Sequence, residues 1–421
     1  MHDFKYKNGQ LYCESVRIAD IAKKVSTPFY LYSYHTLLDH YRKLEKAFRS
    51  IKPLICYSMK ANSNLSICRA LVKAGAGLDI VSGGELYKAF LVGSSPKRIV
   101  YASVGKTEVE IRQAVAGEIL FFNVESESEL ELINKVACDL GVIASVALRI
   151  NPDVEPKTHR YITTGKLTNK FGIDFDTAYK ILQERNRFSH LRFNGLHMHI
   201  GSQIIDARPY ILAIAKVVKF IKRLRLEAVN IEYLNIGGGL GIIYSDEKPQ
   251  TAEQFARKIL PILKGAGLKI ILEPGRFIVG NAGILVTKVL YLKKTPLKNF
   301  IIVDAGMNDL IRPSLYGAYH EILPLKRTAH SAQRTTQYDV VGPICESGDF
   351  FAKGRKLAKV EEGELLAIMS AGAYGFSMAS NYNCRLKPAE VMIKGSEFYI
   401  VRKHDSYLDL VRKDKIPDFL K

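Results

Sequence analysis

One pattern repeats along residues 50–276: a short apolar run, a polar or glycine-containing turn, and an amphipathic stretch with helical spacing. Runs that are apolar along most of their length are typical of strands in a parallel sheet that helices cover on both faces. The apolar runs are 54–57, 78–82, 99–102, 120–124, 146–150, 196–200, 231–236 and 270–273. Eight such units predict an α/β fold, a (β/α)₈ TIM barrel over residues 29–280.

The stretches between these runs carry signals for helix starts. Thr107 with Glu110, and Ser126 with Glu129, have the spacing of a capping box ahead of apolar residues. The interval before the sixth run is longer than the others. Its polar part, 151–171, predicts an inserted active-site loop rather than another strand.

The sequence changes character after residue 280. Apolar runs follow one another without amphipathic stretches between them, at 284–292, 300–303, 338–341, 365–369, 391–393 and 398–401. This arrangement predicts a second, all-β domain over residues 281–421. Residues 1–28 have little helical periodicity, and we expect them to add strands to that domain.

The composition favours an ordinary globular protein over a nucleic-acid binder. The formal net charge is +19, but the excess lysines are scattered along the 421 residues rather than gathered into one arm. No basic stripe interleaved with aromatic residues is present, so a solvated lysine-rich surface is favoured over a surface that binds polyanions.

Cysteine usage and hydropathy indicate a cytoplasmic protein. The six cysteines form no CxxC pair and no cluster with histidines, which argues against a metal site and against a disulfide framework. The first residues, MHDFKYKNGQ, have no apolar stretch behind their charges, so we expect no signal peptide. No apolar run has the length that a membrane span needs.

Residues that could take part in catalysis or ligand binding follow the predicted barrel strands, at the end of the barrel where the active sites of such folds lie. They are Lys60 in YSMKAN, Asp79, His199 in HMHIGSQ, the glycine-rich turn GGGLG at 237–241, and Glu273 with Arg276 in EPGR. Each alone has an ordinary explanation, such as a surface lysine, a tight turn, a core histidine or an ion pair at a turn. Their joint occurrence at successive strand ends favours one active site.

These residue types suit a site for pyridoxal 5'-phosphate. A lysine in a low-dielectric barrel mouth can form a Schiff base with the cofactor aldehyde. A glycine turn lets backbone N–H groups approach a phosphate. A carboxylate opposite the pyridine nitrogen keeps that nitrogen protonated, and a flat imidazole can stack on the ring.

At these residues the sequence closely resembles the fold-type III pyridoxal-phosphate decarboxylases, and within them the diaminopimelate decarboxylases. The resemblance covers nearly the whole chain, and its motifs occur in order. They are YSMKAN, HMHIGSQ, NIGGGLG, EPGR, MNDLIRPSLY, GPICESGD and AGAYG. The resemblance implies an alanine racemase-like arrangement of barrel and β-domain.

The resemblance also implies roles for individual residues. Catalysis would rest on Lys60, which forms the Schiff base, and on Cys345, which protonates the intermediate. The cofactor would be held by Lys60, Asp79, His199, Ser202, Gly239, Glu273, Gly275, Arg276 and Tyr374. The substrate would be bound by Arg276, Arg312, Tyr316, Glu346 and Tyr374.

The implied reaction converts meso-2,6-diaminopimelate to L-lysine and CO₂ at the D-centre, the last step of lysine biosynthesis. The charged residues are consistent with this substrate, because arginines can bind its distal carboxylate and Glu346 can bind its distal ammonium group. The family further implies a homodimer in which a barrel lysine faces the cysteine loop of its partner, with no nucleic acid or membrane involved.

Three alternatives stay open at this point. An ornithine or arginine decarboxylase would share the fold, but its relatives typically carry aspartate where this chain has Glu346. A silent binding protein would be expected to have lost Lys60 or Cys345, and both are present. An alanine-racemase-like activity would need a second tyrosine base in a loop that we do not find.

Overall fold

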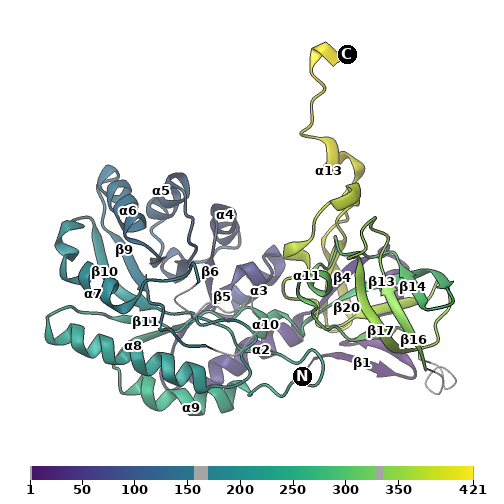
Figure 1. Cartoon of the computed structure of the whole chain (residues 1–421), viewed down its shortest axis with the longest axis horizontal. Coiled ribbons are helices and arrows are strands. Elements are labelled where there is room, and N and C mark those ends of the chain that lie inside the picture. Colours follow the sequence, from purple (N-terminus) through teal and green to yellow (C-terminus); the bar gives the residue numbers. More distant parts are fainter. Residues whose placement is uncertain (1, 156–168, 328–334, 421) are drawn as a thin grey trace. The chain divides into compact units, whose positions relative to one another are not determined.

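The computed structural model describes residues 2–155, 169–327 and 335–420, which form two compact units. The barrel unit comprises Leu38–Ile243 and Glu247–Ile278, and the β-unit comprises Met1–Leu37, Tyr244–Asp246 and Val279–Lys421. Figure 1 traces the barrel unit mainly from purple to teal and most of the β-unit in green and yellow.

The barrel unit contains a closed, all-parallel barrel, as the repeat predicts. In the described part of the chain the barrel has eight strands in the order β10-β11-β12-β5-β6-β7-β8-β9. They are β5 (Leu54–Ser58), β6 (Gly77–Ile80), β7 (Ile99–Tyr101), β8 (Phe121–Val124), β9 (Ala144–Arg149), β10 (Leu191–His197), β11 (Tyr233–Asn235) and β12 (Lys269–Leu272). The predicted (β/α)₈ barrel is therefore confirmed.

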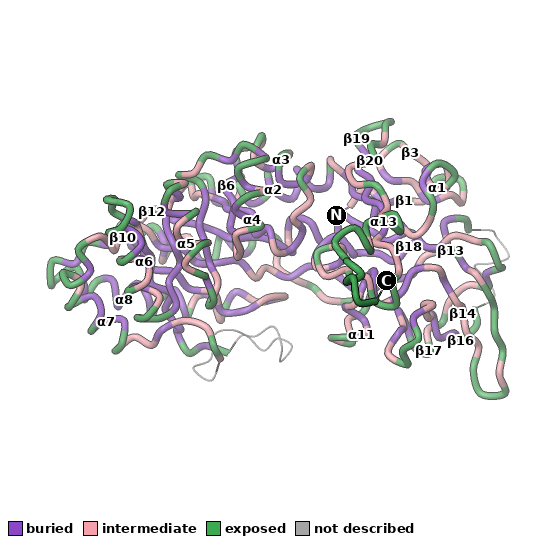
Figure 2. Tube along the Cα trace, turned by 90° about the horizontal axis from the view of Figure 1, so that it is seen from above, coloured by how far each residue is buried: buried purple, intermediate pink, exposed green. Residues whose placement is uncertain are grey.

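Helices alternate with these strands and cover the barrel from outside (Figure 1). They are α2 (Tyr34–Phe48), α3 (Leu65–Lys73), α4 (Gly83–Leu91), α5 (Glu108–Ala116), α6 (Glu127–Asp139), α7 (Phe175–Gln183), α8 (Arg208–Leu226), α9 (Ala252–Lys264) and the short α10 (Arg276–Val279). Figure 2 shows the inner strands as buried and the outward helix surfaces as exposed. Apolar side chains from the strands, such as Val100, Phe121 and Ile271, fill the barrel interior.

The two predicted capping boxes have different outcomes. At the start of α5, Glu110 N–H donates to Thr107 Oγ1 at 3.3 Å, and Thr107 N–H donates to Glu110 Oε2 at 3.0 Å. At the start of α6, Ser126 Oγ accepts the Glu129 N–H at 3.2 Å. The Glu129 carboxylate instead accepts the N–H of Glu125 at 2.9 Å, so this box is only half formed.

The β-unit is built on a mixed sheet. Within the described residues it has nine strands, seven of them in the order β17-β16-β14-β13-β4-β19-β20, while β18 pairs with β13 and β15. The strands are β4 (Phe29–Ser33), β13 (Gly283–Lys294), β14 (Asn299–Val303), β15 (Ile322–Pro324), β16 (Thr335–Val341), β17 (Phe350–Ala358), β18 (Leu365–Ile368), β19 (Ala389–Lys394) and β20 (Glu397–Arg402). The prediction of a second domain built mainly of β-strands is therefore confirmed.

The N-terminal residues join this unit. They form a three-stranded antiparallel sheet of β1 (Phe4–Lys7), β2 (Gln10–Cys13) and β3 (Val16–Arg17), followed by α1 (Ile18–Ala22). Their apolar side chains, including Phe4, Leu11 and Ile18, pack in one core with Leu31 and Val391. The strands thus form a sheet of their own beside the larger one.

The structure differs from the sequence analysis at the start of the barrel. We placed that start at residue 29, but β4 pairs with β13 and β19 of the β-unit, and the barrel unit begins at Leu38. Strands β15 and β17 and the short helices α11 (Arg312–Tyr316) and α13 (Tyr407–Val411) were not anticipated. Along the described ranges, no helix has the length and apolarity to cross a bilayer.

Candidate active site at the barrel mouth and in the β-unit

Lys60 lies directly after β5, at the C-terminal end of the barrel. It is the middle residue of a 3₁₀ turn, Met59–Ala61, whose other two residues are buried while Lys60 is half-buried. Its positive charge acts to lower the pKa of both Asp79 and Glu273, although burial and Glu273 outweigh this effect at Asp79. The lysine is therefore an electrostatic neighbour of both carboxyl groups, as its predicted role requires.

Asp79 is fully buried beside Ser58, its register partner on the neighbouring strand. Ser58 Oγ lies 2.6 Å from Asp79 Oδ2 and 3.0 Å from the main-chain oxygen of Glu273. Burial and the charge of Glu273 raise the pKa of Asp79 well above its usual value. A protonated Asp79 fits this geometry, because it can donate to Ser58 while the serine hydroxyl donates to the Glu273 carbonyl.

Glu273 follows β12 and has side-chain donors around its carboxylate. Oε1 accepts from Asn235 Nδ2 at 2.5 Å and from Asn123 Nδ2 at 3.1 Å, and Oε2 lies 3.2 Å from His197 Nε2. Burial would raise the pKa of Glu273, but the field and hydrogen bond of His197, together with Lys60, lower it to about 2. The side chain is therefore a fixed, buried anion.

His199 lies just beyond β10, against the glycine-rich turn. Its Nδ1 accepts the N–H of Gly238 at 3.2 Å, so that nitrogen carries no proton. Burial, Lys60 and Arg149 lower the pKa of His199 well below its usual value. The imidazole is accordingly neutral, which suits a flat group that stacks on an aromatic ring.

The glycine turn is tightly packed at the same barrel end. A Cβ atom on Gly238 would lie 1.9 Å from the Glu273 carbonyl oxygen, and one on Gly239 would lie 2.2 Å from the Gly201 carbonyl oxygen. Gly239 also has a φ of +106°, where side chains are disfavoured. Packing between the strand ends therefore requires glycine at both positions.

Arg276 begins α10 and is 6% exposed. Its Nε and Nη2 donate to Ser202 Oγ at 3.3 and 3.2 Å. Gly275 precedes it, and a Cβ there would lie 3.0 Å from Ala61 Cβ and 3.1 Å from Ser58 Cβ. The predicted residues Ser202, Gly275 and Arg276 thus lie together at the strand ends.

A second group of buried charges lies next to this cluster. Arg149 Nη1 donates to Glu125 Oε1 at 2.7 Å, and the other Glu125 oxygen accepts the Gly172 N–H at 3.1 Å. Lys106 Nζ donates to the main-chain oxygen of Asn123 at 2.9 Å and pairs with Glu129 at 2.5 Å. These contacts brace the residues that hold Glu273.

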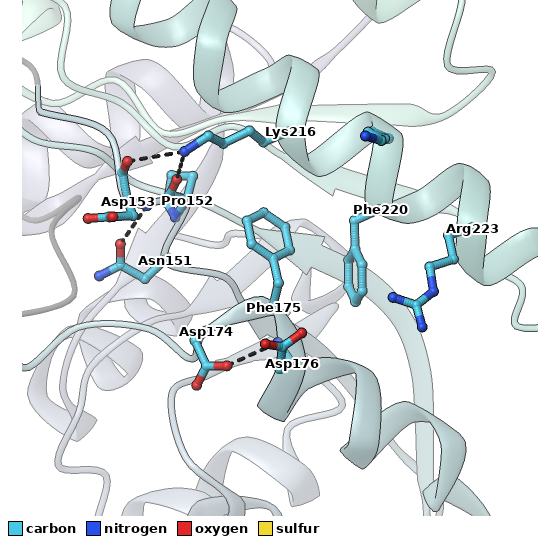
Figure 3. A pocket seen from close by; sticks show the side chains of 10 residues that line it. Asn151, Pro152, Asp153, Asp174, Phe175, Asp176, Lys216, Phe220 and Arg223 are labelled. Carbon is cyan, nitrogen blue, oxygen red and sulfur yellow. Dashed lines mark hydrogen bonds between the residues drawn. The ribbon is translucent and has the colours of Figure 1, made fainter.

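The first residues of the predicted active-site loop, Asn151, Pro152 and Asp153, line a pocket of about 480 Å³. Figure 3 shows Lys216 directed at Pro152, with the rings of Phe175 and Phe220 beside the pocket. Lys216 Nζ donates to the Pro152 oxygen at 2.8 Å, and the two ring centroids lie 5.3 Å apart. Residues 156–168 of the predicted loop lie outside the described residues. No predicted catalytic or binding residue lines this pocket.

The β-unit contains the remaining predicted residues. Arg312 opens the short helix α11, which also contains Tyr316 and ends at Gly317, in the left-handed region at φ +61°. Arg312 is buried, and its guanidinium lies over the ring of Tyr244 at 4.6 Å. Tyr374 is half-buried and also has a left-handed φ, of +56°.

The cysteine loop is exposed at its tip and fixed at its base. The side chains of Cys345 and Glu346 are exposed. Below them, the buried Asp349 accepts the N–H of Ile344 and of Met307, both at 2.7 Å. Asn383 Oδ1 accepts the Cys345 N–H at 2.8 Å. Hydrogen bonds therefore fix the backbone of the loop, while the side chains of Cys345 and Glu346 are exposed.

The sequence matches known proteins along nearly its full length. Residues 35–280 match the family described as "Pyridoxal-dependent decarboxylase, pyridoxal binding domain". A diaminopimelate decarboxylase of Aquifex aeolicus is 48% identical over 96% of this chain and 95% of its own. The chain belongs to the diaminopimelate decarboxylase family of pyridoxal-dependent decarboxylases.

Solved structures of this family agree with the fold. The diaminopimelate decarboxylase of Helicobacter pylori complexed with L-lysine has a TM-score of 0.90 and 42% identity, over 94% of this chain and 98% of that chain. The enzyme of M. jannaschii in complex with L-lysine has a TM-score of 0.94 and 39% identity, over 100% of both chains.

The barrel mouth fits the pyridoxal cofactor that this family uses. Asp79 Oδ1 and His197 Nδ1 are buried polar atoms with no hydrogen-bond partner among the described residues. The Glu273 carboxylate accepts three hydrogen bonds, whereas a carboxylate has about four acceptor positions. An anion with one free acceptor position is the group that a protonated pyridine nitrogen needs.

Several residues of this site were missed from the sequence. His197, Asn123 and Asn235 hold Glu273 in place, and Ser58 links it to Asp79. A signal was present, because each is a polar residue at or near the C-terminal end of an otherwise apolar strand. Asp349 and Asn383 gave no such signal, since they lie in irregular loops.

Asp309, beside the cysteine loop, should make the stability of the β-unit depend on pH. Burial raises the pKa of Asp309 from 3.8 to about 7. The folded protein therefore favours the protonated form, and this contribution is complete below pH 3.8 and lost as the pH rises through about 7. The Asp309→Asn variant stays neutral at every pH. Between pH 3.8 and 7 its free energy of unfolding should therefore fall less than that of the wild type, by up to roughly 4 kcal/mol.

Urea unfolding at several pH values measures this difference. The exposed Asp414→Asn is the control and should follow the wild type. Parallel pH profiles for the wild type and Asp309→Asn would contradict the prediction.

Proposed function

We propose that the chain removes CO₂ from the D-centre of meso-2,6-diaminopimelate and releases L-lysine, the last step of lysine biosynthesis. The observation that carries this proposal is the buried anion Glu273 beside the half-buried Lys60 at the end of a barrel. Its support from outside the chain is the similarity to diaminopimelate decarboxylases, at 48% identity in one relative.

Bound pyridoxal phosphate supplies an electron-accepting ring for the electrons of the broken carbon–carbon bond. Lys60 is the amine that would bind the cofactor aldehyde. Glu273, with its pKa of about 2, stays ionised at neutral pH and would keep the pyridine nitrogen protonated. The neutral His199 would support the ring face, and Ser202, Gly239, Gly275 and Arg276 would bind the phosphate end.

Recognition of the substrate rests on opposite charges in the β-unit. Arg312 and Tyr316 would bind the carboxylate that remains in the product. The exposed Glu346 binds the ammonium group beside it. An arginine suits this task because its planar fork matches a carboxylate in two parallel hydrogen bonds.

Cys345 delivers the proton that replaces CO₂ on the substrate carbon. Its side chain is exposed, while Asn383 and Asp349 order the loop around it. An ordered loop with reactive side chains at its tip is suited to enter another surface. We therefore propose a homodimer in which Cys345 and Glu346 complete the barrel site of the partner, with a twofold axis generating two equal sites.

The proposed compartment is the cytoplasm. All six cysteines are free thiols, three of them exposed, which suits a reducing environment.

A substrate panel tests the reaction. Purified protein with pyridoxal phosphate is supplied with meso-diaminopimelate, its LL-isomer, ornithine, arginine or lysine, and both CO₂ and the amine product are measured. Only the meso-isomer should give rapid CO₂ release with an equal amount of L-lysine. Faster turnover of ornithine or arginine would replace this assignment with a polyamine-forming decarboxylase, and no turnover of any substrate would refute it.

A further inference from the structure

The buried Arg312 has an uncharged partner that the proposed chemistry has not used. Its Nη1 donates to Nε2 of His320 at 2.9 Å. His320 is fully buried and lies four residues beyond the end of α11. Both residues belong to the β-unit.

The contacts of His320 fix its tautomer. Nδ1 lies 2.8 Å from the main-chain oxygen of Met369, and a carbonyl oxygen can only accept, so Nδ1 carries the proton. Nε2 faces a guanidinium, which can only donate, so Nε2 must be an unprotonated acceptor. His320 is therefore neutral, with its lone pair directed at Arg312.

The backbone of His320 is held as firmly as its ring. Arg355 Nη1, from β17, donates to the His320 carbonyl oxygen at 3.0 Å. The ring meets that of Tyr244 edge to face at 5.4 Å, and Tyr244 also lies under the Arg312 guanidinium. One edge and one face of the guanidinium are thus fixed by two ordered neighbours.

We propose that His320 is a positioning residue for substrate recognition, which orients Arg312 toward the substrate carboxylate that remains in the product. This inference rests on the proposed function. A carboxylate partner would orient an arginine equally well, but it would also neutralise its charge. The neutral imidazole orients Arg312 through Nη1 without adding a negative charge of its own.

Two amide substitutions separate the functions of the two ring nitrogens. His320→Asn can keep a donor near Nδ1 for the Met369 oxygen, but its side chain is too short to reach Arg312. His320→Gln can place its carbonyl oxygen near Nε2 and keep the acceptor for Arg312. His320→Asn should therefore raise KM for meso-diaminopimelate about tenfold while kcat changes little, and His320→Gln should stay within about threefold of the wild type.

A substrate without the second carboxylate provides the matched comparison. D-lysine has the reacting centre and a distal ammonium group, but nothing for Arg312 to bind. The ratio of kcat/KM for meso-diaminopimelate over D-lysine should fall about tenfold in His320→Asn. Calorimetric titration with L-lysine, which retains the carboxylate, should show the same rise in Kd without any turnover.

Defined outcomes would overturn the inference. An equal loss on both substrates would assign His320 to general folding, and an unchanged KM in a folded His320→Asn protein would remove its role. If His320→Asn does not fold, a folded His320→Gln with a tenfold higher KM would contradict the acceptor argument. Failure of the wild type to release CO₂ from meso-diaminopimelate refutes the proposed function itself, whatever these variants do.

Discussion

Replacing Lys60 with alanine should lower turnover of meso-diaminopimelate by at least about 10³-fold and remove the borohydride-sensitive visible absorbance of the bound cofactor. The reason is chemical, because among the residues of the barrel-mouth cluster only Lys60 offers an amine for the cofactor aldehyde. The side chain is half-buried, so its loss should leave the fold intact. Rate and absorbance are measured on the same sample, with thermal unfolding as the check on folding.

Mixing this variant with Cys345→Ala tests the shared site. If Lys60 and Cys345 of different subunits complete one site, random exchange of subunits gives about half heterodimers, each with one complete site. Activity should then return to about a quarter of the wild-type value. No recovery after verified exchange would place both residues in the site of a single chain.

The barrel could be predicted from sequence because each strand is apolar over consecutive residues. The prediction was least accurate at β10, which we expected at 196–200 and which spans Leu191–His197. Its first residues include Arg192 and Asn194, which are not buried, so that half of the strand lacks the apolar signature. His199 consequently lies beyond the strand, where it meets Gly238.

Strand β4 could not be assigned correctly from local pattern. All its residues are buried, as in a barrel strand, yet it pairs with β13 and β19. These partners follow it by more than 240 residues in sequence. Apolarity predicts that a segment is buried, but only the partner strands decide which sheet it joins.

In the candidate site, too, one part could be predicted from the sequence and another part could not. Lys60, His199 and Glu273 could be selected because barrel geometry collects residues that follow strands at one end. Their charge states could not be predicted from the sequence, because the low pKa of Glu273 depends on His197, which lies 76 residues away. The tautomer of His320 likewise depends on Met369, through a contact that no sequence motif contains.

Replacing Glu273 with glutamine should separate cofactor binding from catalysis. Glutamine keeps a carbonyl oxygen for Asn123 and Asn235, but it sets an amide N–H₂ group against His197 and removes the negative charge. Lys60 is unchanged, so the visible absorbance of bound cofactor should persist. Turnover should nevertheless fall at least about 10²-fold, because no anion keeps the pyridine nitrogen protonated.

Glu85→Gln is the matched control for losing a carboxylate near Lys60. Glu85 also feels the charge of Lys60, but its carboxylate accepts the Val81 N–H at 2.8 Å in the first turn of α4. Its replacement should cost less than about tenfold in rate, since only a local helix contact is lost. A Glu273→Gln enzyme that keeps more than about a tenth of wild-type turnover would show that catalysis does not need the buried anion. Equal losses in both variants would instead indicate that total negative charge around Lys60, rather than the position of Glu273, sets the rate.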